Sequence, residues 1–439
     1  MNALLVLLLL TIVAALAFAA GFVTAKRRLE RSNTAPAATV DAAAQPQLTA
    51  APPPANGPEV EPVRTVFVQR ANEGTPEWAT AMSDLGGRMR DAGVRLVLFA
   101  HGSFVGDDPL AIASLLDDAL PLFPDLARKL RGVTRAHLSR LLGDLSNFSD
   151  EYVRTFSRAT GVAAVEFTWS GENHHAARVQ GAVRLARTLA LSGGGALRAG
   201  DRALLVGHSH GGQLFAILSQ ILGRSRGFEE LVAAASARGE DVAALDDHLA
   251  ALRRCTIDVA TFGTPLRYSW SPAAGFRLLH IVNHRGTQAE APSLRGVLHT
   301  RQGDYIQQLG AHGSDFPALT ASERAMNARL DRVLGDGSSL RAWLRSVSQG
   351  MRISPQGHTV LVDYGDSARL LPNFLSSGLG HAAYTRRDAM LFHASLIADH
   401  FYPLRPLSSR EPWSRRVRAL VAPARLLPPA RRQPSTPDS

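Results

Sequence analysis

A serine lies at the centre of a glycine-rich corner, in the stretch Gly207-His208-Ser209-His210-Gly211-Gly212. The stretch fits G-x-S-x-G, the nucleophile elbow, in which a strand turns at once into a helix and holds the central hydroxyl clear of the sheet. Glycine on both sides leaves room for backbone that passes close to the turn. A helix that begins here also turns free N–H groups towards the serine oxygen, which favours negative charge there. These residue types predict that Ser209 is a nucleophile.

Two other interpretations compete with the nucleophile at this corner. His208 and His210 could bind a metal, but such a site needs further ligands close by, and two glycines follow instead. The adjacent pair His174-His175 is a poor chelator, because neighbouring side chains diverge in most backbones. We therefore expect no metal and no cofactor. The remaining alternative, an ordinary turn between a strand and a helix, stays open.

Short apolar runs alternate with helical patterns along the middle of the chain. Each run has the length of a strand and few polar residues, which is typical of parallel strands buried on both faces. This alternation predicts an α/β fold, with a mostly parallel sheet and helices on both of its faces. The expected strands cover residues 95–100, 163–168, 203–207, 257–262, 277–282 and 359–362, and the clearest helices cover 176–191, 213–222 and 321–334. Residues 107–160 exceed what a simple crossover needs and predict a helical insertion near the site.

Two further corners lie at the ends of expected strands. The first strand ends in His101-Gly102-Ser103, and the strand after the serine corner ends in Thr261-Phe262-Gly263-Thr264-Pro265. With these turns and the serine corner, the chain resembles the lipase and esterase branch of the α/β-hydrolase family, from about residue 95 to residue 400. The resemblance implies the α/β-hydrolase fold, with the helical insertion after the oxyanion-hole strand. It also implies that the backbone N–H groups of Ser103 and His210 form the oxyanion hole.

The order of the catalytic residues along a chain of this family is nucleophile, acid and then histidine. By that order the resemblance implies Asp304 as the acid, in the segment that follows the fifth expected strand. It implies His381 as the base, because His381 stands in a loop after the last strand and before a helix. His381 would take the serine proton, and Asp304 would stabilise the resulting cation. The alternatives for the acid are Asp315, Asp363 and Asp366.

The resemblance implies a serine esterase or lipase-like enzyme that cleaves carboxylic esters through an acyl-enzyme. Its expected partner is an ester or lipid small molecule. An acyltransferase, a thioesterase or an amidase would use the same triad, and the sequence does not separate them. A membrane-anchored binding protein without turnover is the alternative outside enzymes, although it gives no reason to combine such a serine with such a histidine.

The chain begins with an apolar segment. Residues 3–25 carry no charge and are long enough to cross a bilayer as a helix. Four basic residues follow within residues 26–31, so the positive-inside rule places the body on the cytoplasmic side. We therefore expect a single-pass membrane protein. A cleaved signal peptide, with Ala17-Phe18-Ala19 at the cleavage site, is the alternative and would export the body.

The composition divides the rest of the chain into a linker, a folded domain and a tail. Residues 26–62 are rich in Ala, Pro, Thr and Gln and predict a flexible linker, residues 63–404 predict the folded domain, and residues 405–439 predict a disordered tail rich in Pro and Arg. The tail holds eight arginines and two acidic residues, so it accounts for most of the net charge of +10. No nucleic-acid-binding module accompanies this charge, and we expect no nucleic-acid partner. Cys255 is the single cysteine, which excludes an internal disulfide.

Overall fold

The computed structural model describes residues 62–103, 148–191, 197–285, 303–304, 306–307, 318, 320–335, 353–365 and 380–404. Within these ranges seven strands form one sheet, in which every neighbouring pair is parallel and the order is β1-β7-β6-β5-β4-β2-β3. The strands are β1 (Val63–Val66), β2 (Val94–Ala100), β3 (Ala164–Phe167), β4 (Arg202–His208), β5 (Thr256–Phe262), β6 (Arg277–Asn283) and β7 (His358–Asp363). The predicted α/β class with a mostly parallel sheet is confirmed, and all six predicted strands are present.

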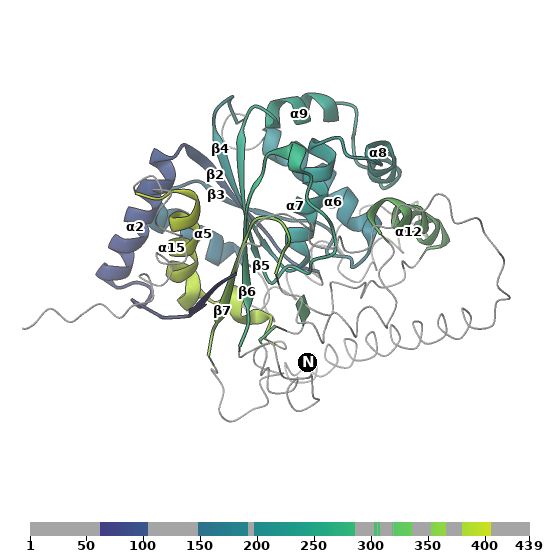
Figure 1. Ribbon diagram of the computed structural model, residues 1–439. Coiled ribbons are helices and arrows are strands. Elements are labelled where there is room, and N and C mark those ends of the chain that lie inside the picture. Colours follow the sequence, from purple (N-terminus) through teal and green to yellow (C-terminus); the bar gives the residue numbers. More distant parts are fainter. Residues whose placement is uncertain are drawn as a thin grey trace, which may run out of the picture.

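Helices cover both faces of the sheet (Figure 1). One face carries α2 (Pro76–Asp91), α5 (Asp150–Thr160) and α15 (Met390–Phe401), and the other carries α6 (His175–Leu191), α7 (His210–Leu222), α8 (Phe228–Ala237), α9 (Leu245–Leu252) and α12 (Ala321–Leu334). Each layer encloses its own buried apolar cluster against the sheet. Strands such as β4 are therefore buried on both faces, which explains why they appear in the sequence as unbroken apolar runs. The described part also holds three short 3-10 turns, η2 (Pro272–Ala274), η3 (Ala382–Tyr384) and η4 (Arg387–Ala389).

The last part of the segment predicted as an insertion belongs to the helical layer instead. Helix α5 forms the crossover between β2 and β3, and Ser149 caps its first turn. The rings of Phe148, Tyr152 and Phe156 all meet Phe99 of β2 edge to face, with centroids 5.0 to 5.8 Å apart. These contacts fix α5 on the sheet. The rest of that prediction, residues 107–147, lies outside the described residues.

The sequence does not predict β1, which lies at one edge of the sheet and pairs with β7. This strand has only four residues, too few to show a period. The predicted anchor at 3–25, the predicted tail at 405–439 and, except for residue 62, the predicted linker at 26–62 lie outside the described residues. Among the helices that the structure describes, none has both the length and the apolar character needed to cross a membrane.

Two buried histidines and a half-buried one make the fold sensitive to acid. Burial lowers the pKa of His280 in β6 to about 4, and burial also lowers the pKa of His393 and of His400 in α15 to about 3. Histidine in an unfolded chain titrates near pH 6.5. Between about pH 6.5 and about pH 4 the unfolded chain therefore binds more protons than the folded one, and the free energy of unfolding falls as the pH falls.

We expect urea denaturation to show this loss between about pH 7 and about pH 5. Each histidine contributes up to about 1.4 kcal/mol per pH unit, so the three together contribute about 4 kcal/mol per unit. The variant His400→Gln keeps a polar side chain that does not titrate, and it should reduce the slope by about a third. A free energy of unfolding that stays constant over this range would contradict the prediction.

Candidate active site

Ser209 alone makes the turn between β4, which ends at His208, and α7, which begins at His210. Its backbone has φ 54° and ψ −129°, a conformation that residues with side chains seldom adopt and that costs about 1–3 kcal/mol. Three hydrogen bonds hold the turn. The Ser209 N–H donates to the carbonyl of Phe262 (2.9 Å), and the Ser209 carbonyl accepts from the Gly212 N–H (3.1 Å) and from Thr264 Oγ1 (2.9 Å). The strained corner that the sequence predicts is therefore present.

The glycines of this corner allow three close approaches. A Cβ on Gly207 would lie 2.8 Å from the backbone nitrogen of Gly212. A Cβ on Gly211 would lie 2.6 Å from the carbonyl oxygen of Ala100 in β2, and one on Gly212 would lie 2.1 Å from Thr264 Oγ1. No larger residue fits at any of these positions without a shift of its neighbours, which accounts for the glycine pattern.

The loop after β2 lies directly against Ser209. A Cβ on Gly102 would lie 2.8 Å from Ser209 Cβ and 3.3 Å from its Oγ. Trp169 fixes the loop, since its indole N–H donates to the His101 carbonyl (3.0 Å) and its backbone N–H donates to His101 Nε2 (3.3 Å). The N–H of Ser103 follows this glycine, and the N–H of His210 is the first of α7. Both groups predicted for the oxyanion hole therefore stand in segments that flank Ser209.

The predicted acid and base contact each other. His381 Nδ1 lies 2.8 Å from Asp304 Oδ2, and Asp304 is completely buried. The other carboxylate oxygen, Oδ1, accepts the backbone N–H of Gln307 (2.9 Å). Of the alternative acids, Asp363 lies at the end of β7, where its side chain is 43 % exposed and pairs with Arg285 at 3.4 Å. Asp315 and Asp366 lie outside the described residues.

His381 also lies beside the serine corner. Its ring packs against the ring of His208 with centroids 4.6 Å apart, and His208 Nε2 lies 3.2 Å from the His381 carbonyl oxygen. Because His208 directly precedes Ser209, these contacts place the predicted base beside the serine corner, although no hydrogen bond joins His381 Nε2 to Ser209 Oγ. Asp304 engages Nδ1 of the imidazole, while Nε2 is buried and has no hydrogen-bond partner among the described residues. A neutral imidazole that donates from Nδ1 can accept a proton at Nε2.

The sequence does not identify two residues of the site, Tyr384 and Asn283. Tyr384 donates its hydroxyl proton to Asp304 Oδ2 (2.8 Å), and Asn283 donates its side-chain amide to the carbonyl of Gly380 (2.8 Å). The loops that carry the acid and the base touch, since a Cβ on Gly380 would lie 2.3 Å from the carbonyl oxygen of Gly303. The spacing of three between His381 and Tyr384 is the one local signal, because a helical turn places such residues on one side.

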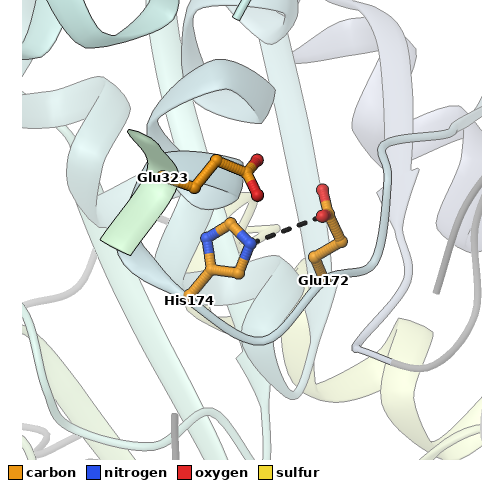
Figure 2. A group of neighbouring side chains, drawn as sticks. All are labelled: Glu172, His174 and Glu323. Atoms are coloured by element: carbon orange, nitrogen blue, oxygen red, sulfur yellow. Dashed lines mark hydrogen bonds and ion pairs between the residues drawn. The ribbon is translucent and has the colours of Figure 1, made fainter. Parts of the chain in front are cut away.

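A second polar cluster, Glu172, His174 and Glu323, lies near the start of α6 (Figure 2). Its ligand atoms are within 4.8 Å of one another, and His174 Nε2 lies 3.4 Å from Glu172 Oε1. The guanidinium of Arg238 pairs with both carboxylates, at 2.5 Å for Glu172. Burial alone would raise the pKa of Glu172, but the hydrogen bond from His174 and the charge of Arg238 outweigh burial and lower the pKa. An arginine thus supplies the positive charge that a metal would bring, and we assign no metal to this cluster.

The neighbouring histidine points elsewhere, as the sequence predicts for an adjacent pair. His175 Nδ1 lies 2.7 Å from the hydroxyl of Tyr268, and His175 Nε2 lies 3.0 Å from Asp331 in α12. His174 and His175 therefore take different partners and do not chelate together.

Comparison of the chain with protein-family models, with curated proteins and with solved structures finds no match. The function must therefore be inferred from the geometry around Ser209, His381 and Asp304.

Proposed function

We propose that the chain is a serine hydrolase of the α/β-hydrolase fold that cleaves carboxylic esters. The observation that carries the proposal is the strained turn at Ser209 with an imidazole beside it whose Nδ1 is bonded to a buried carboxylate. The three residues follow the order nucleophile, acid and histidine along the chain. Ser209 stands at the end of a central strand, and Asp304 follows β6 while His381 follows β7.

The proposed reaction begins with attack of Ser209 Oγ on the carbonyl carbon of the ester, while His381 Nε2 takes the hydroxyl proton. Asp304 holds the imidazole in the required tautomer and stabilises its cation. The N–H groups of Ser103 and His210 bind the negative oxygen of the tetrahedral intermediate, and each such donor contributes about 3–4 kcal/mol. The alcohol then leaves with the proton from His381. Water attacks the acyl-enzyme by the same steps and releases the acid.

A non-catalytic binding protein is the competing function, and two features of the site argue against it. The turn at Ser209 costs free energy in the folded state, and a binding surface has no need for that conformation. The buried Nε2 of His381, which finds no partner within the described ranges, is also costly unless a substrate or a proton uses it. Acyl transfer, thioester cleavage and amide cleavage would use the same groups and form the alternatives within enzymes. We further propose that residues 3–25 anchor the enzyme to a membrane, which favours lipid esters as substrates.

Labelling of the full chain with a fluorophosphonate probe tests the proposal. We expect one adduct per chain, and mass spectrometry of the digested protein should place it on the peptide that contains Ser209. A chelator should leave the labelling unchanged, whereas prior denaturation should abolish it, because only the folded site activates the hydroxyl. An unlabelled chain, or an adduct on another serine, would count against the triad. A panel of esters with graded acyl chains then shows whether long-chain lipids are preferred.

A further inference from the structure

Tyr384 stands behind the acid of the proposed triad. It is completely buried in the turn η3, three residues after His381. Its hydroxyl oxygen accepts the backbone N–H of Asn283 at 2.7 Å, and the same hydroxyl lies 2.8 Å from Asp304 Oδ2. A backbone N–H can only donate, so the single proton of the tyrosine points to the carboxylate. Burial, followed by the charge of Asp304, raises the pKa of Tyr384 well above its ordinary value, which keeps that proton in place.

Tyr384 and His381 share one carboxylate oxygen. Asp304 Oδ2 receives the tyrosine hydroxyl and the imidazole Nδ1, each at 2.8 Å, while Oδ1 receives the N–H of Gln307. A carboxylate that accepts a further hydrogen bond carries less free negative charge on that oxygen, and it is a weaker partner for an imidazolium. The tyrosine therefore moderates the attraction between Asp304 and the charged form of His381.

The backbone of Gly263 packs directly against both Tyr384 and Asp304. Its φ is +57°, and a Cβ at this position would lie 2.4 Å from the Tyr384 ring and 2.6 Å from Asp304 Oδ2. The tyrosine ring and the carboxylate thus rest together on the turn after β5. This close approach gives the glycine of the Thr261–Pro265 turn a role that the sequence alone does not show.

We propose that Tyr384 is a positioning residue that fixes Asp304 and weakens the attraction of Asp304 for the protonated imidazole of His381. The inference rests on the proposed function, because it concerns the same triad. Within the described residues, two other titratable groups meet the ring of Tyr384, and these are His208 at the end of β4 and Tyr364 after β7. His393 on α15 and Arg386 before η4 lie one step further away, where they act on Tyr364.

The test compares Tyr384→Phe with Tyr364→Phe in the full chain. Tyr364 is a matched control, because it is buried in the same cluster, its ring meets that of Tyr384 at 5.7 Å, and its hydroxyl bonds His393 Nε2 at 2.6 Å instead of the triad. Tyr384→Phe should move the acid limb of kcat/KM upward by about 0.5–1 pH unit, since the imidazolium gains a stronger partner. It should also lower kcat about tenfold, since the carboxylate is less firmly held. Tyr364→Phe should change neither quantity by more than about twofold.

An unchanged acid limb in Tyr384→Phe, or an equal shift in both variants, would overturn the proposal. If Tyr384→Phe does not fold, fluorotyrosine can replace the tyrosines of the Tyr364→Phe chain and keep the packing. The fluorinated hydroxyl is a stronger donor, so the acid limb should then move to lower pH, and no movement would overturn the proposal.

A second readout separates this inference from the proposed function. The imidazole of His381, assigned in the NMR spectrum with His381→Gln, should titrate at higher pH in Tyr384→Phe whether or not esters are hydrolysed. If Tyr384→Phe shows this shift but the wild-type chain takes no fluorophosphonate, the hydrolase is refuted and the positioning role is retained. If the wild-type chain is labelled but Tyr384→Phe shows no shift, the hydrolase is retained and the positioning role is refuted.

Discussion

Replacing Ser209 with alanine should lower kcat for ester hydrolysis by a factor on the order of 10⁶. The change removes the attacking oxygen and little else, because the hydrogen bonds that hold the turn involve the backbone N–H and carbonyl of residue 209, which alanine retains. The variant should therefore fold, and it should still bind the substrate. Rates measured with a chromogenic ester, together with a far-UV circular dichroism spectrum, check both parts of this prediction.

Ser219→Ala is the matched control, because it removes a serine hydroxyl from a buried position on α7, the helix that follows Ser209. Ser219 Oγ donates to the carbonyl of Ala216 (2.7 Å) and accepts the N–H of Ser271 (2.9 Å), so the control disturbs packing without touching the site. Its kcat should stay within about twofold of the wild-type value. If Ser209→Ala retained comparable activity, the hydrolysis would belong to another group, and the proposed mechanism would be wrong.

Replacing Asp304 with asparagine should lower kcat by about 10⁴. Three donors converge on the carboxylate, with Gln307 N–H on Oδ1 and the groups of Tyr384 and His381 on Oδ2. An asparagine has one oxygen and one NH₂ group, so in either orientation its NH₂ must face at least one of these donors. If the NH₂ faces the imidazole, Nδ1 must accept instead of donate, and Nε2 then carries the proton and can no longer act as a base.

Asp363→Asn provides the comparison, since it makes the same chemical change at the alternative acid that the structure describes. Asp363 pairs with Arg285 at 3.4 Å, away from the triad. The kcat of Asp363→Asn should therefore remain within about twofold of the wild-type value. The pH dependence of kcat should be recorded for both variants. A small effect of Asp304→Asn would move the role of the acid to Asp315 or Asp366.

The sheet was largely predictable because buried parallel strands have a strong signature. Strands β2, β4, β5, β6 and β7 lie inside the sheet between the two helical layers, so each appears as a mostly apolar run of six or seven residues. Strands β1 and β3 form the two edges, and both are short and only partly buried. Three of the four residues of β3 are apolar, against two of four in β1, which explains why only β3 is visible in the sequence. Helix α7 begins at His210, three residues before its predicted start. The prediction missed this first turn because glycines weaken helix propensity. The glycines stand there because the neighbouring backbone leaves no room for a side chain.

The turn at Ser209 was predictable from local residues, whereas Asp304 and His381 were predicted only through the family resemblance and its order of residues along the chain. The turn at Ser209 needs small residues at fixed offsets, and that requirement is visible in six consecutive residues. The contacts of Asp304 are set by tertiary packing instead, since His381 and Tyr384 lie 77 and 80 residues further along the chain. Tyr384 could not be separated from other core tyrosines by sequence, because its role depends on the backbone N–H of Asn283, which occupies its acceptor site.

The position of β1 beside β7 has a consequence for folding of the chain during its synthesis on the ribosome. Among the described elements, β1 and α2 are synthesised first, and each has a partner near the end of the chain, since β1 pairs with β7 and Arg88 of α2 pairs with Asp399 of α15 across 311 residues. At about 5–20 residues per second, the ribosome needs about 15–60 s to complete that interval. During this time the edge of β1 and the side of α2 that packs on α15 stay exposed to water, so newly made chains should depend on chaperones until α15 has emerged.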